Sequence, residues 1–182
     1  EKKTGVPYEN IFITAIHQHS TPCYATTGFA TSANYKTLIM KRIAESAEKA
    51  LEDLAPCEMY TAIAETEGIA FVKHYLMNDG TYCGDNFGSS ASGYAGHASE
   101  ADNVLQMIKF TREGGKDVVL INWQAHYAGA NTIDYYAISA DYPGIMRNEV
   151  EKQLDCHAAF VLGGAGNLVS SSRITNTYIT DG

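Results

Sequence analysis

The 182-residue chain carries a net charge of −8, and 45% of its residues are hydrophobic while 19% are charged. This balance is typical of one globular domain with a hydrophobic core and excludes a disordered segment. Because the negative charge would repel phosphate groups, we expect neither nucleic acid nor an anionic membrane surface as a partner. Composition leaves the oligomeric state undetermined.

The chain has no apolar run near the roughly 20 residues needed to cross a bilayer. It opens with "EKKTGVPYENIF", without an initiator Met and as though inside a longer protein, so a signal peptide could precede it and the compartment stays open. Free thiols are the favoured interpretation of the four cysteines, which form no CxxC pair: Cys23, Cys57, Cys83 and Cys156.

The first predicted element is a buried strand from Ile11 to His17, where β-branched and apolar residues run into "HQHSTP". An amphipathic helix is predicted over about Asn34 to Leu54, because apolar residues recur at steps of three and four. Asn34 or Ser32 would cap this helix, and Pro56 prevents its continuation.

Two strands are then predicted, Met59 to Thr66 and Ile69 to Leu76, on either side of Glu67-Gly68. The stretch from Met77 to Asp102 is dense in Gly, Ser and Asp. A structureless excursion of this length is typical either of a functional or mobile loop or of a plain surface insertion, and both interpretations stay open.

Two further strands, Val104 to Phe110 and Asp117 to His126, are predicted around the turn "TREGGK". The run "VVLINWQAH" is of the kind that is buried on both faces. A helix begins at Asp141 with Pro143 in its first turn, and His157 to Leu162 is the last core strand. The order predicts an α/β fold, with a mixed β-sheet and flanking helices in a single layered domain.

Histidines end two of the predicted strands: His17 and His19 the first, and His126 a later one. Because the carboxyl ends of strands carry the ligand crevice in open α/β sheets, we expect these side chains to converge. In an extended chain the rings of His17 and His19 would lie on one side, about 7 Å apart. A catalytic zinc takes about three protein ligands and one open position.

The plainer interpretation is that each of these histidines is a hydrogen-bonded structural residue, since HxH alone is a loose motif. The other three histidines have no matching context and are interpreted as structural: His74, His97 and His157.

Several segments occur in an order that resembles the neutral/alkaline non-lysosomal ceramidase family and its bacterial relatives: "GVPYENIFITAIHQHSTP", "DGT", "VLQMIKFTREGGKDVVLINWQAH", "ISADYPG" and "FVLGGAGN". The resemblance runs over nearly all of the chain and implies a zinc-dependent amide hydrolase. It implies that His17 and His126 bind zinc and that His19 assists the substrate or water. The family's Glu and Tyr ligands have no counterpart before Gly182. Residues 1–182 are therefore expected to be part of a longer catalytic domain, inactive alone and holding half of the zinc site.

Two departures from the family pattern concern the substrate. Gly163 stands where the resemblance places a serine implicated in catalysis, with Asn167 for an aspartate, and Lys73 or His74 would have to replace an arginine. Lys keeps the charge but lacks the bidentate fork of Arg. Lys73 and Gly163 are the predicted substrate-binding positions, and ceramide itself is in question as the substrate.

In the implied mechanism metal-activated water needs no serine, and His19 would orient the water or the oxyanion. Asp141 is interpreted as a helix N-cap or as support behind a ligand. The segment "GGAGN" either brings backbone N–H groups close to the substrate or is only a tight turn.

Three hypotheses follow. The first is a zinc-dependent hydrolase that cleaves an N-acyl amide of a small molecule or lipid, with a sphingolipid as one candidate. The second is another HxH metal-dependent hydrolase, of the amidohydrolase type, whose barrel would need about 250 residues. The third is a degenerate domain that binds a ligand or partner without turnover, which Gly163 and Val72-Lys73-His74 favour.

Overall fold

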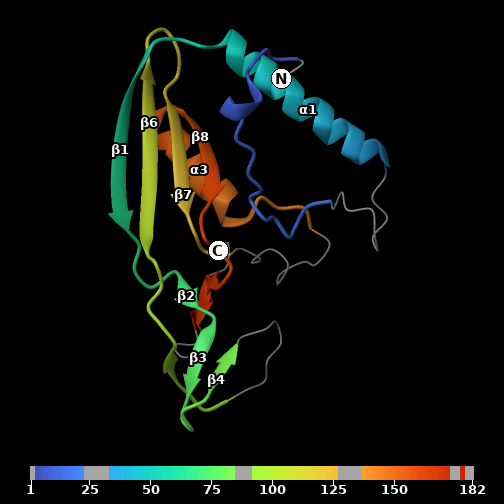
Figure 1. Ribbon diagram of the computed structural model, residues 1–182. Helices are drawn as coiled ribbons and strands as arrows, with labels where there is room; N and C mark the ends of the chain where they lie inside the picture. The colour runs from blue at the N-terminus through green and yellow to red at the C-terminus, as the bar shows by residue number, and fades with distance from the viewer. Residues whose placement is uncertain (1–2, 23–32, 85–91, 127–136, 173–176, 179–182) are drawn as a thin grey trace.

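The main body of the computed structural model is a four-stranded sheet in the order β1-β6-β7-β8 (Figure 1). The structure describes residues 3–22, 33–84, 92–126, 137–172 and 177–178. Strands β1, β6 and β7 are antiparallel neighbours, and β8 runs parallel to β7. This confirms the predicted mixed sheet. The four strands are β1 (Cys57–Glu65), β6 (Val104–Arg112), β7 (Val118–Trp123) and β8 (His157–Leu162).

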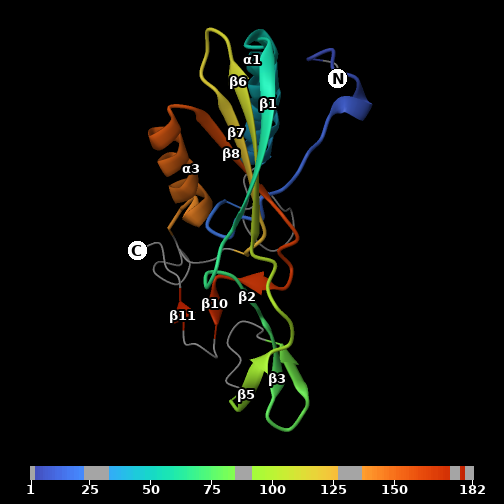
Figure 2. The same cartoon turned by 90° about the vertical axis from the view of Figure 1, so that its left-hand side faces the viewer.

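Helix α3 (Asp141–Leu154) covers one face of this sheet (Figure 2). Its Met146 and Val150, one turn apart, pack against a buried cluster that includes Val119 and Ile121. The helical spacing of these apolar residues predicted this contact correctly, because one face of an amphipathic helix must be buried to stabilise it. Among the described helices, none packs on the opposite face of the sheet in the same way. The prediction that β7 is buried on both faces is therefore wrong, and its residues alternate between buried and half-buried.

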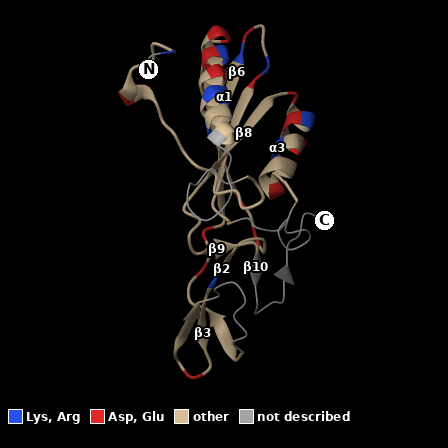
Figure 3. Cartoon of the chain, turned by 90° about the vertical axis from the view of Figure 1, so that its right-hand side faces the viewer, with Lys and Arg blue, Asp and Glu red and all other residues tan. Residues whose placement is uncertain are grey.

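Helix α1 (Ala33–Glu52) matches the predicted helix in extent. It has already begun at Ala33, so Asn34 is not its N-cap, and Ser32 lies outside the described residues. The end of α1 is held to the sheet by Arg112, which donates hydrogen bonds to the carboxylate and to the carbonyl of Asp53. Charged side chains gather on α1, on α3 and around the β6–β7 turn (Figure 3).

The predicted buried strand from Ile11 to His17 is wrong. A one-turn 3₁₀ helix, η1 (Tyr8–Asn10), precedes the segment, and residues 11–18 are irregular. Phe12 is 85% exposed and Ile13 81%. A strand requires a hydrogen-bonding neighbour, and none of the described strands pairs with this segment.

The predicted strand Ile69–Leu76 is divided at Lys73, because its two halves have different partners. The first half, β2, pairs with β9, and the second, β3, pairs with β4 and β5. Two parts of the stretch Met77–Asp102 are thus strands, and only residues 85–91 lie outside the described structure. The small elements are β2 (Phe71–Val72), β3 (His74–Met77), β4 (Tyr82–Gly84), β5 (Tyr94–His97), β9 (Leu168–Val169), β10 (Ser171–Ser172) and β11 (Thr177–Tyr178).

The cysteines agree with the expectation of free thiols. Cys57, Cys83 and Cys156 form no disulfide, while Cys23 lies outside the described residues. Among the described helices, none combines the length and the apolar character that crossing a membrane requires.

Candidate metal centre

Three histidine side chains from distant parts of the sequence meet beyond the carboxyl end of β7. The Nε2 atom of His19 lies 3.0 Å from Nε2 of His17 and 3.0 Å from Nε2 of His126. All three rings offer a nitrogen within 4.8 Å of the others, and their planes are steeply inclined to one another. The expected convergence of His17, His19 and His126 is therefore present.

His126 is held rigidly by the central sheet. It follows β7 by three residues, and its backbone N–H donates to the carbonyl of Leu168 at 2.9 Å. An isolated bridge to Val169 fixes it from the same side. The preceding Ala125 is completely buried, and the amide of Gln124 donates to the backbone of Asp102 and Val104. His126 is itself only 7% exposed, so its position is set by the core.

The other two histidines lie on an exposed segment that is bent at the site. His17 has a φ of 57°, a left-handed conformation that is uncommon for a residue with a side chain. This bend places its ring centroid 4.7 Å from that of His19, closer than the roughly 7 Å of an extended chain. Local backbone strain of this kind clusters at functional sites.

Ser20 anchors the segment just after the histidines. Its side chain is 3% exposed, its N–H donates to the side-chain oxygen of Gln18, and its carbonyl accepts the N–H of Ser139 at 3.0 Å. Sequence reasoning missed Ser20, Ser139 and the backbone of Leu168. Ser139 lies within the "ISADYPG" motif, whereas no local pattern distinguishes Leu168.

The site favours neutral imidazoles. Burial, followed by the neighbouring charges of His19, His17 and Lys73, lowers the pKa of His126 to about 4, against an opposing effect of Asp141. Burial and the charges of His17 and Lys73 also lower the pKa of His19. Since the neutral ring is the form that binds a metal, these two side chains are ready to act as ligands at neutral pH.

The donor set fits a zinc ion in chemistry and in spacing. Two nitrogens bound to tetrahedral zinc, each at about 2.0–2.1 Å, are separated by roughly 3.3 Å. The two observed separations of 3.0 Å are close to this value. A single cation between the rings would interact with all three nitrogens, whereas one proton can bridge only one pair. His19 lies between the two ligands that the resemblance implies, with its Nε2 atom 3.0 Å from that of each, so all three histidines could hold a metal ion.

The charge of Lys73 acts on this centre, because it lowers the pKa of both His19 and His126. Its backbone N–H donates to the carbonyl of Asn167 at 2.9 Å, which brings the Val72–His74 segment beside "GGAGN".

Gly163 lies close to the side chain of Gln124. A Cβ atom added at Gly163 would lie 3.1 Å from the Cβ of Gln124, which is a tight contact. The N–H of Gly163 donates to the carbonyl of Trp123. Substrate binding by Lys73 and Gly163 stays a prediction.

Asp141 lies at the start of α3, with a φ of 53° and only 6% of its surface exposed. Its carboxylate accepts the N–H of Tyr142, and its own N–H donates to the hydroxyl of Ser139. Because its charge raises the pKa of His126, Asp141 lies in the electrostatic surroundings of the site. Among the described residues, the group able to hold a metal consists of the three histidines alone.

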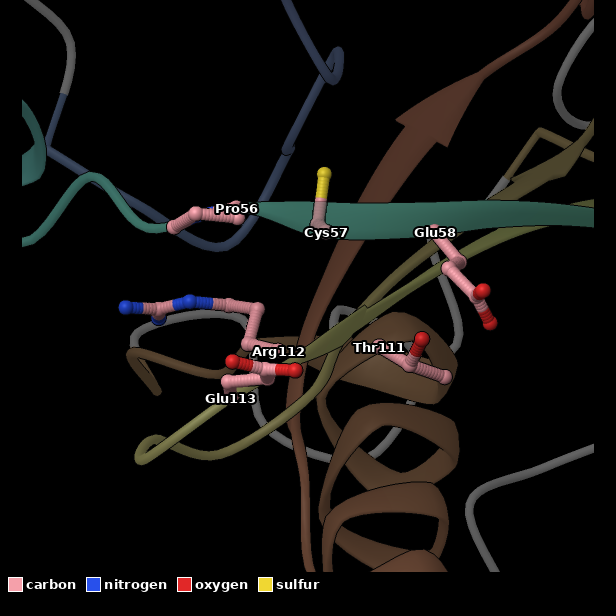
Figure 4. Close-up of a pocket in the computed structure, with 6 residues that line it drawn as sticks. All are labelled: Pro56, Cys57, Glu58, Thr111, Arg112 and Glu113. Atoms are coloured by element: carbon pink, nitrogen blue, oxygen red, sulfur yellow. The ribbon is translucent and has the colours of Figure 1, made fainter.

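The remaining histidines lie away from this group. His97 is bound through Nδ1 to the carbonyl of Val72 and packs on aromatic rings. His74 packs on Tyr82, and His157 begins β8 at the opposite end of the sheet. A shallow pocket at that opposite end is lined by six residues shown in Figure 4: Pro56, Cys57, Glu58, Thr111, Arg112 and Glu113. It is separate from the candidate metal centre.

Fold and site together define an α/β domain whose central strand leads to a cluster of three histidines able to hold a metal. Solved ceramidase structures are among those that share this fold. One is described as a ceramidase complexed with C2, at 18% identity, and another is the neutral ceramidase from Pseudomonas aeruginosa, at 16%. Both have a TM-score of 0.50. They match 72% and 78% of this chain, respectively.

The aligned regions are only 20% and 22% of those two ceramidase chains, so this chain spans about a fifth of their length. At this level of identity the likeness shows the fold. The resemblance to ceramidases that the sequence motifs predicted is therefore confirmed for the fold. The chain matches no model of a known protein family and no curated protein sequence.

Proposed function

We propose that this chain carries the metal site of a ceramidase-like, zinc-dependent hydrolase that cleaves an N-acyl amide bond. The observation that carries the proposal is the meeting of three imidazole Nε2 atoms, contributed by His17, His19 and His126, beyond the end of the central strand. The likeness of fold to solved ceramidases supports the same assignment. A small-molecule or lipid amide is the substrate class that it suggests.

The three histidines divide the work of the site. When bound, zinc lowers the pKa of a bound water to about 7 and polarises a carbonyl group. His126 supplies the rigid ligand, because its backbone is fixed by β7 and β9. His17 supplies a ligand from the opposite side of the site. His19, neutral at pH 7, either completes the donor set or accepts a proton from the attacking water.

Lys73 has the charge needed to stabilise an oxyanion. Its charge lowers the pKa of both His19 and His126, and this supports a role for Lys73 in the electrostatics of the site. A positive charge near the scissile carbonyl stabilises negative charge that develops on the oxygen. The ammonium group acts as a point charge, so it would tolerate several amide substrates where an Arg fork would select one geometry.

The test combines metal content with hydrolysis. A longer form of the protein, which adds the remaining expected ligands to this chain, is loaded with zinc and dialysed. Its metal content is measured by mass spectrometry, and it is then assayed with N-acyl substrates of short and long acyl chains. One zinc per chain together with hydrolysis that ceases in His17→Ala and His126→Ala supports the proposal. His157→Ala, at the other end of the sheet, is the matched control.

The role of His19 is read from His19→Gln. Loss of both zinc and hydrolysis identifies a third ligand, whereas retained zinc with lost hydrolysis identifies a proton acceptor. Stoichiometric zinc without hydrolysis of any amide would favour the hypothesis of a domain that binds without turnover. A chain that takes up no zinc would refute the proposed function.

A further inference from the structure

Helix α3 begins at the same end of the central sheet as the histidine cluster. It lies between β7 and β8 in the chain, and these two strands are parallel. A connection between parallel strands has to cross back from the carboxyl end of the first to the amino end of the second. The first turn of α3 therefore lies near the carboxyl end of β7, which leads to His126 (Figure 2).

The side chain of Tyr142, in this first turn, holds the strand end that carries His126. Its hydroxyl donates a hydrogen bond to the carbonyl of Ala125 at 2.6 Å. Its ring packs edge-on against Trp123 and Phe160, with centroids 5.2 and 5.9 Å away. Ala125 is completely buried and directly precedes His126, so this hydrogen bond fixes the backbone beside a candidate ligand.

The residues before Tyr142 hold the other side of the cluster. The N–H of Ser139 donates to the carbonyl of Ser20 at 3.0 Å, and the buried Ser20 directly follows His19. The hydroxyl of Ser139 accepts the N–H of Asp141 at 2.9 Å, and the carboxylate of Asp141 accepts the N–H of Tyr142 at 2.7 Å. A continuous set of hydrogen bonds thus joins the contact with Ser20 to the contact made by Tyr142.

Asp141 keeps this turn in an uncommon backbone conformation, with a φ of 53°. Among the described residues other than glycine, a positive φ occurs at three positions: His17, Asp141 and Asp155. Asp155 ends α3, whereas the other two lie in the cluster and in the turn beside it. Such a conformation persists where the surrounding contacts determine it, and it is typical of functional sites.

We propose that Ser139 to Tyr142 form a bracket that sets the separation between the two sides of the metal centre, with Tyr142 as the positioning residue for His126. One end of the bracket holds the backbone before His126, and the other holds the backbone after His19. Ligand nitrogens have to keep a fixed separation around one ion. This inference rests on the proposed function, because it requires that the cluster binds a metal.

The first test is Tyr142→Phe in the longer form of the protein, with zinc affinity measured by competition with a chromophoric chelator. The change removes the hydroxyl and keeps the ring that packs on Trp123. Residues that orient metal ligands change metal affinity by about 10- to 100-fold, so we expect the zinc dissociation constant to rise about tenfold. The visible spectrum of Co²⁺, bound in place of zinc, should also change, because it reports the coordination geometry.

Tyr94→Phe is the matched control. It removes a buried hydroxyl that has no hydrogen-bond partner among the described residues. Its zinc affinity and Co²⁺ spectrum should equal those of the unchanged protein. A purely structural role of Tyr142 would lower the free energy of unfolding without moving either readout, and that result would overturn the proposal.

A double variant tests whether the two ends belong to one bracket. Ser139→Ala removes the hydroxyl that accepts the N–H of Asp141, so it should also raise the zinc dissociation constant. Breaking either end releases the separation that the bracket sets. The double variant Ser139→Ala/Tyr142→Phe should therefore raise the constant by clearly less than the product of the two single effects. Two independent supports would give the full product, which would overturn the bracket.

Hydrogen exchange in the metal-free protein separates this inference from the proposed function. The N–H of Ser139 is protected by its bond to Ser20, and Tyr142→Phe should accelerate its exchange about fivefold relative to amides of β6. Accelerated exchange in a protein that takes up no zinc would support the bracket and refute the proposed function. Zinc uptake with unchanged exchange and unchanged affinity in Tyr142→Phe would overturn the bracket and leave the proposed function standing.

Discussion

His126 is the buried member of the histidine cluster. Replacing it by Ala removes one candidate zinc ligand and should therefore weaken zinc binding. Zinc sites with four protein ligands bind with about 10–16 kcal/mol, or roughly 3 kcal/mol for each ligand. Loss of one ligand therefore raises the zinc dissociation constant by about 100-fold. At a zinc concentration of 100 times the native dissociation constant, binding stabilises the folded state by about 2.7 kcal/mol. In His126→Ala that increment should fall to about 0.4 kcal/mol.

The assay is urea unfolding in zinc and in chelator, followed by tryptophan fluorescence. Trp123 is the single tryptophan of the chain, is 5% exposed and lies three residues before His126, so its signal reports on this part of the core. His157→Ala is the control, because it changes a histidine at the far end of the sheet. The reasoning is refuted if His126→Ala keeps the full zinc increment, or if His157→Ala loses it equally.

Three further outcomes test the core and the electrostatics of the site. Ile121→Ala, at a position 1% exposed beneath α3, should cost about 2–5 kcal/mol of unfolding free energy in urea, while Ile108→Ala on the uncovered face should cost clearly less. Lys73→Met should raise the pKa of His126 and His19 in NMR titrations of the metal-free chain, and an unchanged or lower pKa would contradict the argument. The folded pKa of His126, about 4, lies below its unfolded value of about 6.5. The metal-free chain should therefore lose stability as pH falls from 6.5 toward 4, and a His126→Gln variant should lose less over that window when both are unfolded in urea.

Elements with strong local patterns were predictable from the sequence. The periodicity of α1, the Pro143 and apolar spacing of α3, and the hairpin of β6 and β7 all occur close to their predicted bounds. In each of these elements the signal is contained in the segment itself, as a helical repeat or a turn between two apolar runs. The helical repeat of α1 did not predict whether this helix packs on the sheet. Ile43, which belongs to its apolar face, is in fact 55% exposed.

The errors concern segments whose state depends on distant partners. The apolar run Ile11–His17 has the composition of a core strand, but a strand forms only where a neighbour supplies its hydrogen bonds. The stretch Met77–Asp102 looked structureless because its Gly and Ser content conceals short strands that are stabilised by β3. Local composition carries no information about these pairings.

The sequence predicted which histidines form the candidate site, but it predicted their arrangement in space only in part. The predicted convergence of His17, His19 and His126 is present, although only His126 follows a strand and the segment before His17 is irregular. The spacing of the first two was wrong, because it assumed an extended chain where His17 has a positive φ. The proximity of Lys73 depends on the pairing of β2 with β9, which the sequence does not reveal.

The two sides of the histidine cluster differ greatly in how they are held, and this gives a bound metal a structural role as well as a chemical one. His126 belongs to a buried core, whereas His17 and His19 lie on an irregular, largely exposed segment. This segment is held in part by the cluster itself and by the hydrogen bond from the N–H of Ser139 to the carbonyl of Ser20. Ordering such a segment costs about 1–2 kcal/mol of backbone entropy per residue. Metal coordination across the two sides offsets part of that cost, because its free energy is released only when the segment and the sheet are brought together. Metal binding and the ordering of residues 11–20 are therefore expected to be one coupled equilibrium.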